Sequence, residues 1–220
     1  MSNLFKFDKA KSEKQFIIIG TDEAGRGPGA GPVYSAAVCF PTINTKLIKL
    51  FEKLNDSKQL NEKIREELFE LIKENSIFSI VSSSVEEIEN LNILQASLLS
   101  MKKACNTVIE QIENNNLIKI LVDGNKLIPR TNWNQEFIIK GDSKSASIAA
   151  ASILAKVSRD KFMKELAKEF PHYGWESNKG YLTKLHLDAI DKFGITKWHR
   201  KKFLEKHFEK SKQMSLTLWE

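Results

Sequence analysis

The sequence predicts an α/β fold in which a mixed five-stranded sheet is flanked by helices and followed by a C-terminal helical extension. Short apolar runs rich in β-branched residues recur along the first two thirds of the chain. Helical periodicities separate several of these runs. The length of 220 residues is enough for one large domain with a substantial core.

Five runs are expected to form the strands. They span residues 16–22, 32–40, 76–83, 117–123 and 136–142. Short connections join the first three strands, which should therefore pair antiparallel. The later strands follow helical crossovers and should run parallel.

The helical periodicities lie between and after these strands. A helix should begin at Asn61, a good N-cap, and a longer one should cover about residues 92–113. An Ala-rich helix begins near Ser143 and should pack closely against the sheet. Beyond Pro171 we expect a glycine-containing loop and two short helices.

Composition excludes several classes of protein. Hydrophobic residues make up 41% of the chain and charged residues 28%, which argues against wholesale disorder. No apolar run is long enough to span a bilayer, and the N-terminus lacks the apolar core of a signal peptide. Cys39 and Cys105 lie in apolar runs and are expected to be buried free thiols. We therefore expect a soluble, cytoplasmic protein, and a monomer.

The net charge of +6 is a weak indication of a polyanionic partner. Basic residues gather near the C-terminus with few balancing acids: Lys192, Lys197, Arg200, Lys201, Lys202, Lys206, Lys210 and Lys212. A solvated helix face and a phosphate-binding surface explain this stretch equally well.

Four carboxylates follow or end predicted strands. Asp22 and Glu23 end the first strand, and Asp123 and Asp142 end two later ones. At about 4 Å two such charges repel by about 4 kcal/mol at an effective dielectric near 20, so four together need a cation. An all-oxygen site suits Mg²⁺ or Mn²⁺. Taken singly, each aspartate is also an ordinary turn former.

The segment DEAGRGPGAGP (22–32) follows the same strand. Adjacent residues of a regular strand face opposite ways, so Asp22 and Glu23 share one site only if the chain twists or breaks there. The glycines make such a break plausible and let the backbone approach a phosphate or sugar, with Arg26 as a phosphate fork. A tight connection between strands explains the glycines equally well.

Several segments together resemble ribonuclease HII, the type 2 ribonuclease H family, over about residues 16 to 205. They are GTDEAGRGPGAGPV (20–33), NDSKQLNEKIREELFELI (55–72), LVDGN (121–125), KGDSKSASIAAASILAKVSRD (140–160), YGWESNKGYLTKLHLDAI (173–190) and FGITKWHRKKF (193–203). The type 3 enzymes carry a domain ahead of the catalytic one, whereas here about fifteen residues precede the first strand.

The resemblance implies a segmented chain with a defined activity. It implies an N-terminal segment (1–15), a ribonuclease H-like catalytic domain (16–170) and a helical extension that contacts substrate (171–208). The implied enzyme hydrolyses the RNA strand of RNA–DNA hybrids and cuts on the 5′ side of single ribonucleotides in duplex DNA. Two-metal hydrolysis would leave 3′-hydroxyl and 5′-phosphate ends.

The resemblance also assigns residues. The family's metal-binding acids match Asp22, Glu23, Asp123 and Asp142. The element that recognises the ribose 2′-hydroxyl matches Gly25, Arg26 and Gly27, and the tyrosine that packs on the neighbouring deoxyribose matches Tyr181.

Other matched positions have less defined roles. Lys58, Lys144 and Ser147 are candidates for phosphate binding, although Ser147 suits a helix cap equally well. His186 and His199 are expected to have structural or phosphate-contacting roles rather than catalytic ones.

Three positions depart from the family pattern. Gly29 stands where a larger apolar residue is usual, Ser145-Ala146 replaces a common Val-Pro, and Leu182 replaces a frequent glycine after Tyr181. No metal ligand is lost. Leu182 can alter how the Tyr181 loop sits, so the junction preference is the property it puts in question.

Residues 209–220 are expected to form a flexible tail. Within it, Gln213–Trp219 resembles peptides that dock on replication sliding clamps, and a frayed terminus is the alternative. Two rival functions stay open for the whole chain: a resolvase-like nuclease of the same fold, and a non-catalytic nucleic-acid-binding module.

Overall fold

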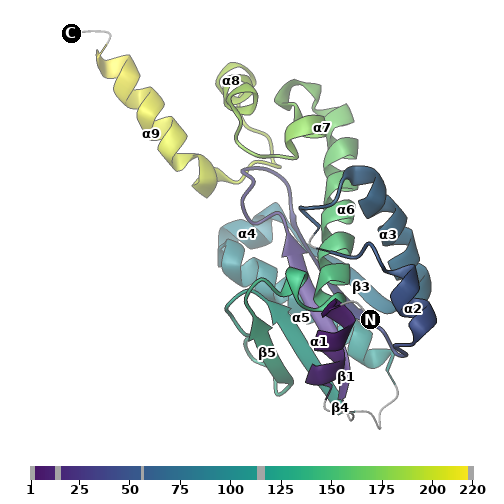
Figure 1. Ribbon diagram of the computed structural model, residues 1–220. Coiled ribbons are helices and arrows are strands. Elements are labelled where there is room, and N and C mark those ends of the chain that lie inside the picture. The colour runs from purple at the N-terminus through teal and green to yellow at the C-terminus, as the bar shows by residue number, and fades with distance from the viewer. Residues whose placement is uncertain (1–2, 13–15, 56, 113–116, 218–220) are drawn as a thin grey trace.

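A computed structural model describes residues 3–12, 16–55, 57–112 and 117–217, with side chains described to residue 209. Its centre is a five-stranded sheet of order β3-β2-β1-β4-β5 (Figure 1). The strands are β1 (Phe16–Ala24), β2 (Val33–Cys39), β3 (Ile77–Ser83), β4 (Leu117–Asp123) and β5 (Asn134–Ile138). β2 pairs antiparallel with both β1 and β3, whereas β1–β4 and β4–β5 are parallel, which confirms the predicted mixed sheet.

Helices connect and follow the strands. They are α1 (Asn3–Lys11), α2 (Thr45–Leu50), α3 (Glu62–Asn75), α4 (Val85–Leu91), α5 (Ile93–Glu110), α6 (Ala146–Glu169), α7 (Trp175–Asn178), α8 (Lys184–Phe193) and α9 (Lys201–Thr217), with 3-10 turns η1 (Gly141–Ser143) and η2 (Pro171–Tyr173). Asn61 caps α3 as predicted, because its side chain accepts a hydrogen bond from the Ile64 N–H. The helix expected over 92–113 is shorter, and α4, begun by a capping box at Ser84, precedes it.

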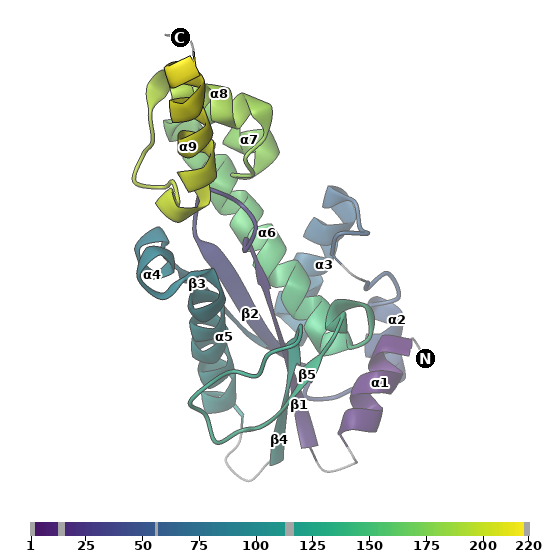
Figure 2. The same cartoon turned by 90° about the vertical axis from the view of Figure 1, so that its left-hand side faces the viewer.

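The two faces of the sheet are covered by different helices. α5 packs on one face, and α6 packs on the other with α3 beside it (Figure 2). Alternate residues of β2 serve the two sides: Ala36 and Val38 lie in the core with α6, and Ala37 and Cys39 lie in the core with α5. Cys39 and Cys105 are both free and buried, as predicted.

The first turn of α6 lies directly against β1 at Gly20. A Cβ at Gly20 would stand 2.3 Å from the Ile148 backbone nitrogen, so no larger residue fits there. The following alanines of α6, including Ala149, Ala150 and Ala151, are fully buried, which confirms the predicted close packing. This contact fixes α6 along β1 and lets its next turns reach the end of that strand.

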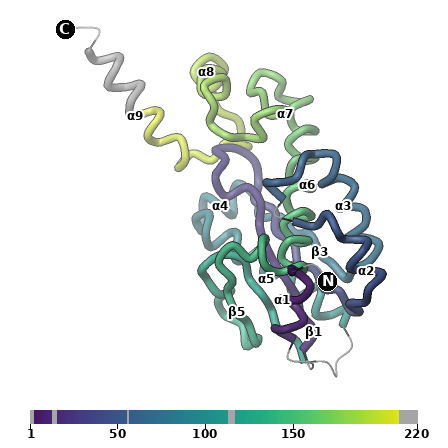
Figure 3. The backbone as a smooth tube through the Cα atoms, viewed as in Figure 1, coloured from purple at the N-terminus to yellow at the C-terminus, as the bar shows by residue number. Residues whose placement is uncertain are grey.

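α1 was not foreseen within the N-terminal segment, and it corrects the interpretation of Ser147. Figure 3 shows α1 beside β1, and it also contacts α6. Asp8 accepts hydrogen bonds of 2.8 Å from both the backbone N–H and the hydroxyl of Ser147, which is only 1% exposed. Both donors are therefore taken inside the protein, and Ser147 does not bind phosphate. It is not the cap either, because Ser145 accepts the capping bond from Ile148.

The segment that was expected to form a tail begins as a continuation of α9. α9 continues to Thr217, because the chain contains no glycine or proline from Lys201 to Thr217 to end it. The last part of the clamp-like peptide, including Trp219, lies outside the described residues. Within the described chain, every helix is too short or too polar to cross a membrane.

Candidate active site

The four predicted acids come from neighbouring parts of the sheet. Asp22 and Glu23 lie near the end of β1, and Asp123 ends β4, its parallel neighbour. Asp142 does not end a strand as predicted, since β5 stops at Ile138 and Asp142 lies in the turn η1. Asp123 Oδ1 accepts a 2.7 Å hydrogen bond from the Gly141 N–H, which ties that turn to β4. All four acids therefore lie near the carboxyl ends of the neighbouring parallel strands β1 and β4.

Adjacent residues of a regular strand face apart, so a twist or break was expected at Asp22 and Glu23 for both to serve one site. Pairing of β1 with β4 ends at Thr21, whereas pairing with β2 continues to Ala24. β1 therefore continues as a regular strand through Asp22 and Glu23, without the break that the glycines suggested, and both acids lie just beyond the last residue paired with β4. Asp22 also accepts a 2.6 Å bond from the Glu23 N–H, so the two residues are locally linked.

Burial and mutual repulsion act on these acids. The pKa of Asp22 is raised well above its ordinary value, first by burial and then by the charges of Glu23 and Asp123. Burial also raises the pKa of Glu23, while Arg26 opposes that shift. The carboxylates are thus close enough to repel one another in a partly dehydrated site. Binding of a cation would relieve this repulsion.

The side chains of the four acids are not arranged as the ligands of a metal ion in this structure. Among the described residues, no three His, Cys, Asp or Glu side chains are arranged to hold a metal ion. Instead the Arg26 guanidinium lies 3.2 Å from the Glu23 carboxylate, and the Lys58 ammonium lies 4.0 Å from that of Asp142. The donor set consists of carboxylate oxygens alone, which fits Mg²⁺ or Mn²⁺.

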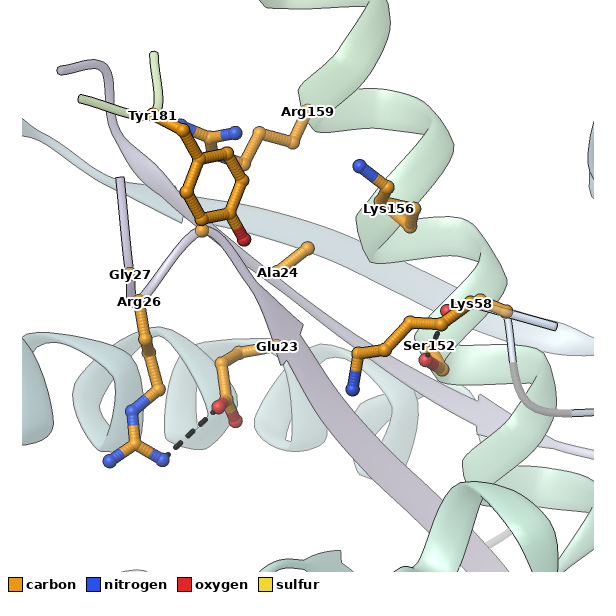
Figure 4. A pocket seen from close by; sticks show the side chains of 11 residues that line it. Glu23, Ala24, Arg26, Gly27, Lys58, Ser152, Lys156, Arg159 and Tyr181 are labelled. Carbon is orange, nitrogen blue, oxygen red and sulfur yellow. Dashed lines mark hydrogen bonds and ion pairs between the residues drawn. The ribbon is translucent and has the colours of Figure 1, made fainter. Parts of the chain in front are cut away.

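A cavity of about 270 Å³ lies beside the acids (Figure 4). It is lined by Glu23, Ala24, Gly25, Arg26, Gly27, Ser57, Lys58, Ser152, Lys156, Arg159 and Tyr181. Figure 4 shows the Glu23 carboxylate turned toward the Arg26 guanidinium, and the Lys58 side chain extending toward Glu23 from the opposite side. The cavity joins the predicted 2′-hydroxyl element and Tyr181 to one of the predicted metal ligands.

Helix α6 adds residues to the cavity that the sequence had not singled out. Ser152, Lys156 and Arg159 follow one another at helical spacing and so share a face of α6. The Ser152 hydroxyl lies 2.9 Å from that of Ser57, and Lys156 pairs with Asp160 at 2.8 Å. The spacing of these polar residues within an Ala-rich helix was the available signal.

Glycine is required at the start of the loop. Gly25 has a φ of 103°, and a Cβ there would lie 2.1 Å from the Arg159 Nε. At Gly27 a Cβ would meet the Tyr181 ring at 3.3 Å. Because these two positions lack side chains, Arg159 packs against the loop at Gly25 and the Tyr181 ring packs against it at Gly27.

Two buried arginines hold the backbone of this loop. Arg159 donates to the carbonyls of Ala30, Pro32 and Lys179 at 2.9 to 3.1 Å. Arg200 donates to the carbonyls of Gly25, Arg26, Pro28 and Gly31 at 2.7 to 3.3 Å. Burial lowers the pKa of Arg159 to about 10 and that of Arg200 to about 9. Arg200, counted above within a possible phosphate-binding stretch, is instead fully buried.

A neutral histidine pair supports the loop that carries Tyr181. The Thr196 N–H donates to His199 Nδ1 at 2.8 Å, so the proton of His199 resides on Nε2, which lies 3.1 Å from His186 Nε2. His186 Nε2 also accepts from the Trp175 indole, which leaves Nδ1 to donate to the Tyr181 carbonyl at 2.9 Å. Burial lowers both pKa values, that of His199 to about 4. The pair is structural, as expected.

Lys144 lies apart from these contacts. It is exposed at the end of η1, two residues after Asp142. Its proposed contact with phosphate stays a prediction.

A mixed β-sheet with four carboxylates near the ends of its two central parallel strands, beside a basic, glycine-walled cavity, defines a metal-dependent nuclease of the ribonuclease H-like class. The family model for ribonuclease HII matches residues 19–211. Ribonuclease HII of Pelagibacter ubique is 53% identical over 188 residues, which cover 85% of this chain and 95% of that protein. The protein of the same name from Endomicrobium trichonymphae is 48% identical over 204 residues, 92% of each chain.

Solved structures agree. The PCNA:RNase HII complex from Archaeoglobus fulgidus matches with a TM-score of 0.66 and 26% identity, covering 84% of this chain and 94% of that one. Ribonuclease H2 from Pyrococcus horikoshii shares the fold at a TM-score of 0.64 and 24% identity, covering 84% and 92%. The chain belongs to the ribonuclease HII family and is an endoribonuclease dependent on divalent metal ions.

Proposed function

We propose that this ribonuclease cuts duplex DNA on the 5′ side of single embedded ribonucleotides, in addition to the RNA strand of RNA–DNA hybrids, and leaves 3′-hydroxyl and 5′-phosphate ends. The observation that carries this proposal is the position of the Tyr181 ring, packed against Gly27 beside Glu23 in one cavity. A group that recognises the sugar and a group that serves the reaction therefore line the same small space.

The loop backbone is suited to recognising a 2′-hydroxyl. Arg200 takes the carbonyls of Gly25 and Arg26. Since the C=O and N–H of one planar peptide point in opposite directions, the N–H groups of Arg26 and Gly27 point away from Arg200. Those N–H groups, with no Cβ at Gly27, would donate to the hydroxyl that distinguishes RNA from DNA.

Asp22, Glu23, Asp123 and Asp142 would hold Mg²⁺ or Mn²⁺. Divalent ions held there supply an activated water and offset charge on the leaving oxygen. The acids bind the ions and orient them. Lys58, between Glu23 and Asp142, and Lys156 would contact phosphates of the bound strand.

The deciding experiment uses a DNA duplex containing one ribonucleotide, with Mg²⁺, with Mn²⁺ and with chelator. We expect one cut on the 5′ side of the ribonucleotide, only with metal, and no cut in the matched all-DNA duplex. Cleavage of all-DNA four-way junctions would instead favour the resolvase-like alternative. Binding of every duplex without cleavage in either metal would favour the non-catalytic module and contradict the proposal.

We also propose that Gln213–Trp219 docks on a replication sliding clamp. Support comes from the glutamine followed by spaced apolar residues and from a related RNase HII solved in complex with PCNA. A chain that ends after Lys212 should lose clamp affinity and keep full activity on short duplexes. An intact protein with no measurable affinity for the clamp would rule this out. We propose further that the enzyme is a monomer and acts in the cytoplasm.

A further inference from the structure

We propose that Leu182 and Gly29 form one specificity-determining contact that sets the position of Tyr181, so that the two positions can be exchanged only together. This inference rests on the proposed role of Tyr181 at the RNA–DNA junction. It assigns a positioning function to a residue pair far apart in sequence, each of which departs from the family pattern.

Leu182 occupies the space that a side chain at position 29 would need. A Cβ at Gly29 would lie 2.5 Å from Leu182 Cδ2 and 2.7 Å from Cγ. Gly29 is not in the left-handed region that favours glycine. The backbone there can adopt the conformation of a larger residue, and the three atoms nearest to the added Cβ all belong to Leu182. The small residue at 29 and the large one at 182 therefore offset each other.

The backbones on both sides of this contact are fixed. The Gly29 N–H donates to the Gly180 carbonyl at 2.9 Å, and the Gly29 carbonyl accepts from the Arg200 N–H at 2.8 Å. Position 29 therefore cannot shift away from Leu182 without breaking bonds to two other segments. A residue added at 29 must move the Leu182 side chain or its loop.

Tyr181 and Leu182 are consecutive in the chain and contact different surroundings. Leu182 packs with the buried cluster of the C-terminal extension, whereas Tyr181 is 51% exposed and meets Gly27. The Tyr181 carbonyl accepts from the Thr183 N–H at 2.8 Å and bonds His186 Nδ1. The bonds to the Tyr181 carbonyl fix the position of the backbone, and the inserted Leu182 side chain fixes the orientation of the Tyr181–Leu182 segment. Displacing Leu182 therefore turns the Tyr181 ring away from Gly27.

A double-mutant cycle tests the contact: Gly29→Val, Leu182→Gly and the double variant. Each is assayed for kcat and KM on a duplex with one ribonucleotide and on a continuous RNA–DNA hybrid, and its thermal unfolding is recorded. We expect Gly29→Val to lower kcat/KM on the single ribonucleotide by about 30-fold, because misplacement by about 1 Å can cost a hundredfold. The hybrid, whose cleavage needs no junction, should lose about threefold, and the double variant should recover both to within about threefold.

Additive effects in the cycle, or equal losses on both substrates, would overturn the proposal. Leu182→Ala serves as a matched control for Leu182→Gly, since it removes the packing without adding the flexibility of glycine. Both variants should lose activity on the single ribonucleotide relative to the hybrid. If Gly29→Val fails to fold, Gly29→Ala replaces it, and rescue by Leu182→Gly is still required. A wild-type enzyme that cuts hybrids and never a single ribonucleotide would refute the proposed function, whereas coupling in the unfolding temperatures would still test the packing.

Discussion

The two halves of the cavity differ in how they are held. Arg200 donates to the carbonyls of Gly25 and Arg26, and His186 bonds the carbonyl of Tyr181. Arg159 holds the adjoining backbone at Ala30 and Lys179. The four carboxylates are crowded and partly dehydrated, with Arg26 and Lys58 as near cations. With the proposed roles, the difference teaches that this chain builds its substrate-recognition half itself, whereas metal ions would complete its catalytic half.

The largest effect is expected at the catalytic half. Asp123→Asn keeps the size of the side chain and removes the charge, so the rate of cleavage should fall by about 10³-fold or more, while affinity for the duplex stays within about threefold. Cleavage and binding are measured on the same ribonucleotide-containing duplex. Asp188→Asn, an exposed acid on α8, is the control and should be silent. An active Asp123→Asn enzyme would remove this carboxylate from the site.

The recognition half should respond through stability. Arg200→Met leaves four loop carbonyls without their donor, which should cost about 3 kcal/mol of unfolding free energy in urea. KM for the ribonucleotide duplex should rise as well. Lys201→Met, at the exposed neighbour, should change stability by no more than about 0.5 kcal/mol. Equal stability of the two variants would show that Arg200 does not hold the loop.

The low-pH limit of stability should depend on the histidine pair. The pKa of His199 falls from 6.5 to about 4 on folding, so the unfolded chain binds its proton more readily. Stability from this group is full above about pH 6.5 and is lost as the pH falls toward 4, by at most about 1.4 kcal/mol per pH unit. His199→Gln should flatten the pH dependence of urea unfolding over that window. An unchanged slope would mean that folding does not lower the pKa of His199.

The catalytic half should carry a stability cost without metal. The pKa of Asp22 is raised from 3.8 on folding, so its contribution to stability falls as the pH rises from about 4 through the higher folded value. Asp22→Asn should therefore stabilise the metal-free protein at pH 7 by about 1 kcal/mol. Mg²⁺ should raise the unfolding temperature of the wild type and hardly affect the variant. If the variant is less stable than the wild type in chelator, the ionised Asp22 carboxylate does not destabilise the metal-free protein.

The smallest effect is expected at Lys144. If it contacts one phosphate, Lys144→Ala should lower the slope of log affinity against log salt by about one and leave kcat unchanged. Lys126→Ala, an exposed lysine after β4, is the matched control. Identical slopes for the two variants would remove Lys144 from the interface.

Much of the fold followed from local pattern, and the exceptions have identifiable causes. The strands, their pairing directions and the buried face of α6 could be predicted because apolar period and connection length determine them. α1 was missed because its stabilising contact, Asp8 to Ser147, joins residues 139 apart in sequence. The break at Asn92 depends on a positive φ that composition does not reveal.

The site divides in the same way. Motif matching located Glu23, Gly25 and Tyr181, which the structure brings to one cavity. It could not show that Arg200 lies under the loop and not on the surface, since a basic stretch looks the same in both cases. Ser147 was misassigned because its partner comes from a distant helix. The relation of Gly29 to Leu182 could not be predicted from the sequence, because it depends on where the fold places the Leu182 side chain.

We expect the glycine-arginine-glycine loop and Tyr181 to recognise the ribonucleotide without metal, whereas cleavage requires metal ions at the four acids. The direct test measures affinity of the Asp123→Asn protein for a duplex with one ribonucleotide and for the matched all-DNA duplex, in chelator and in Mg²⁺. We predict that the preference for the ribonucleotide duplex is already present in chelator and changes by less than about threefold with Mg²⁺. A preference that appears only when Mg²⁺ is added would contradict the account.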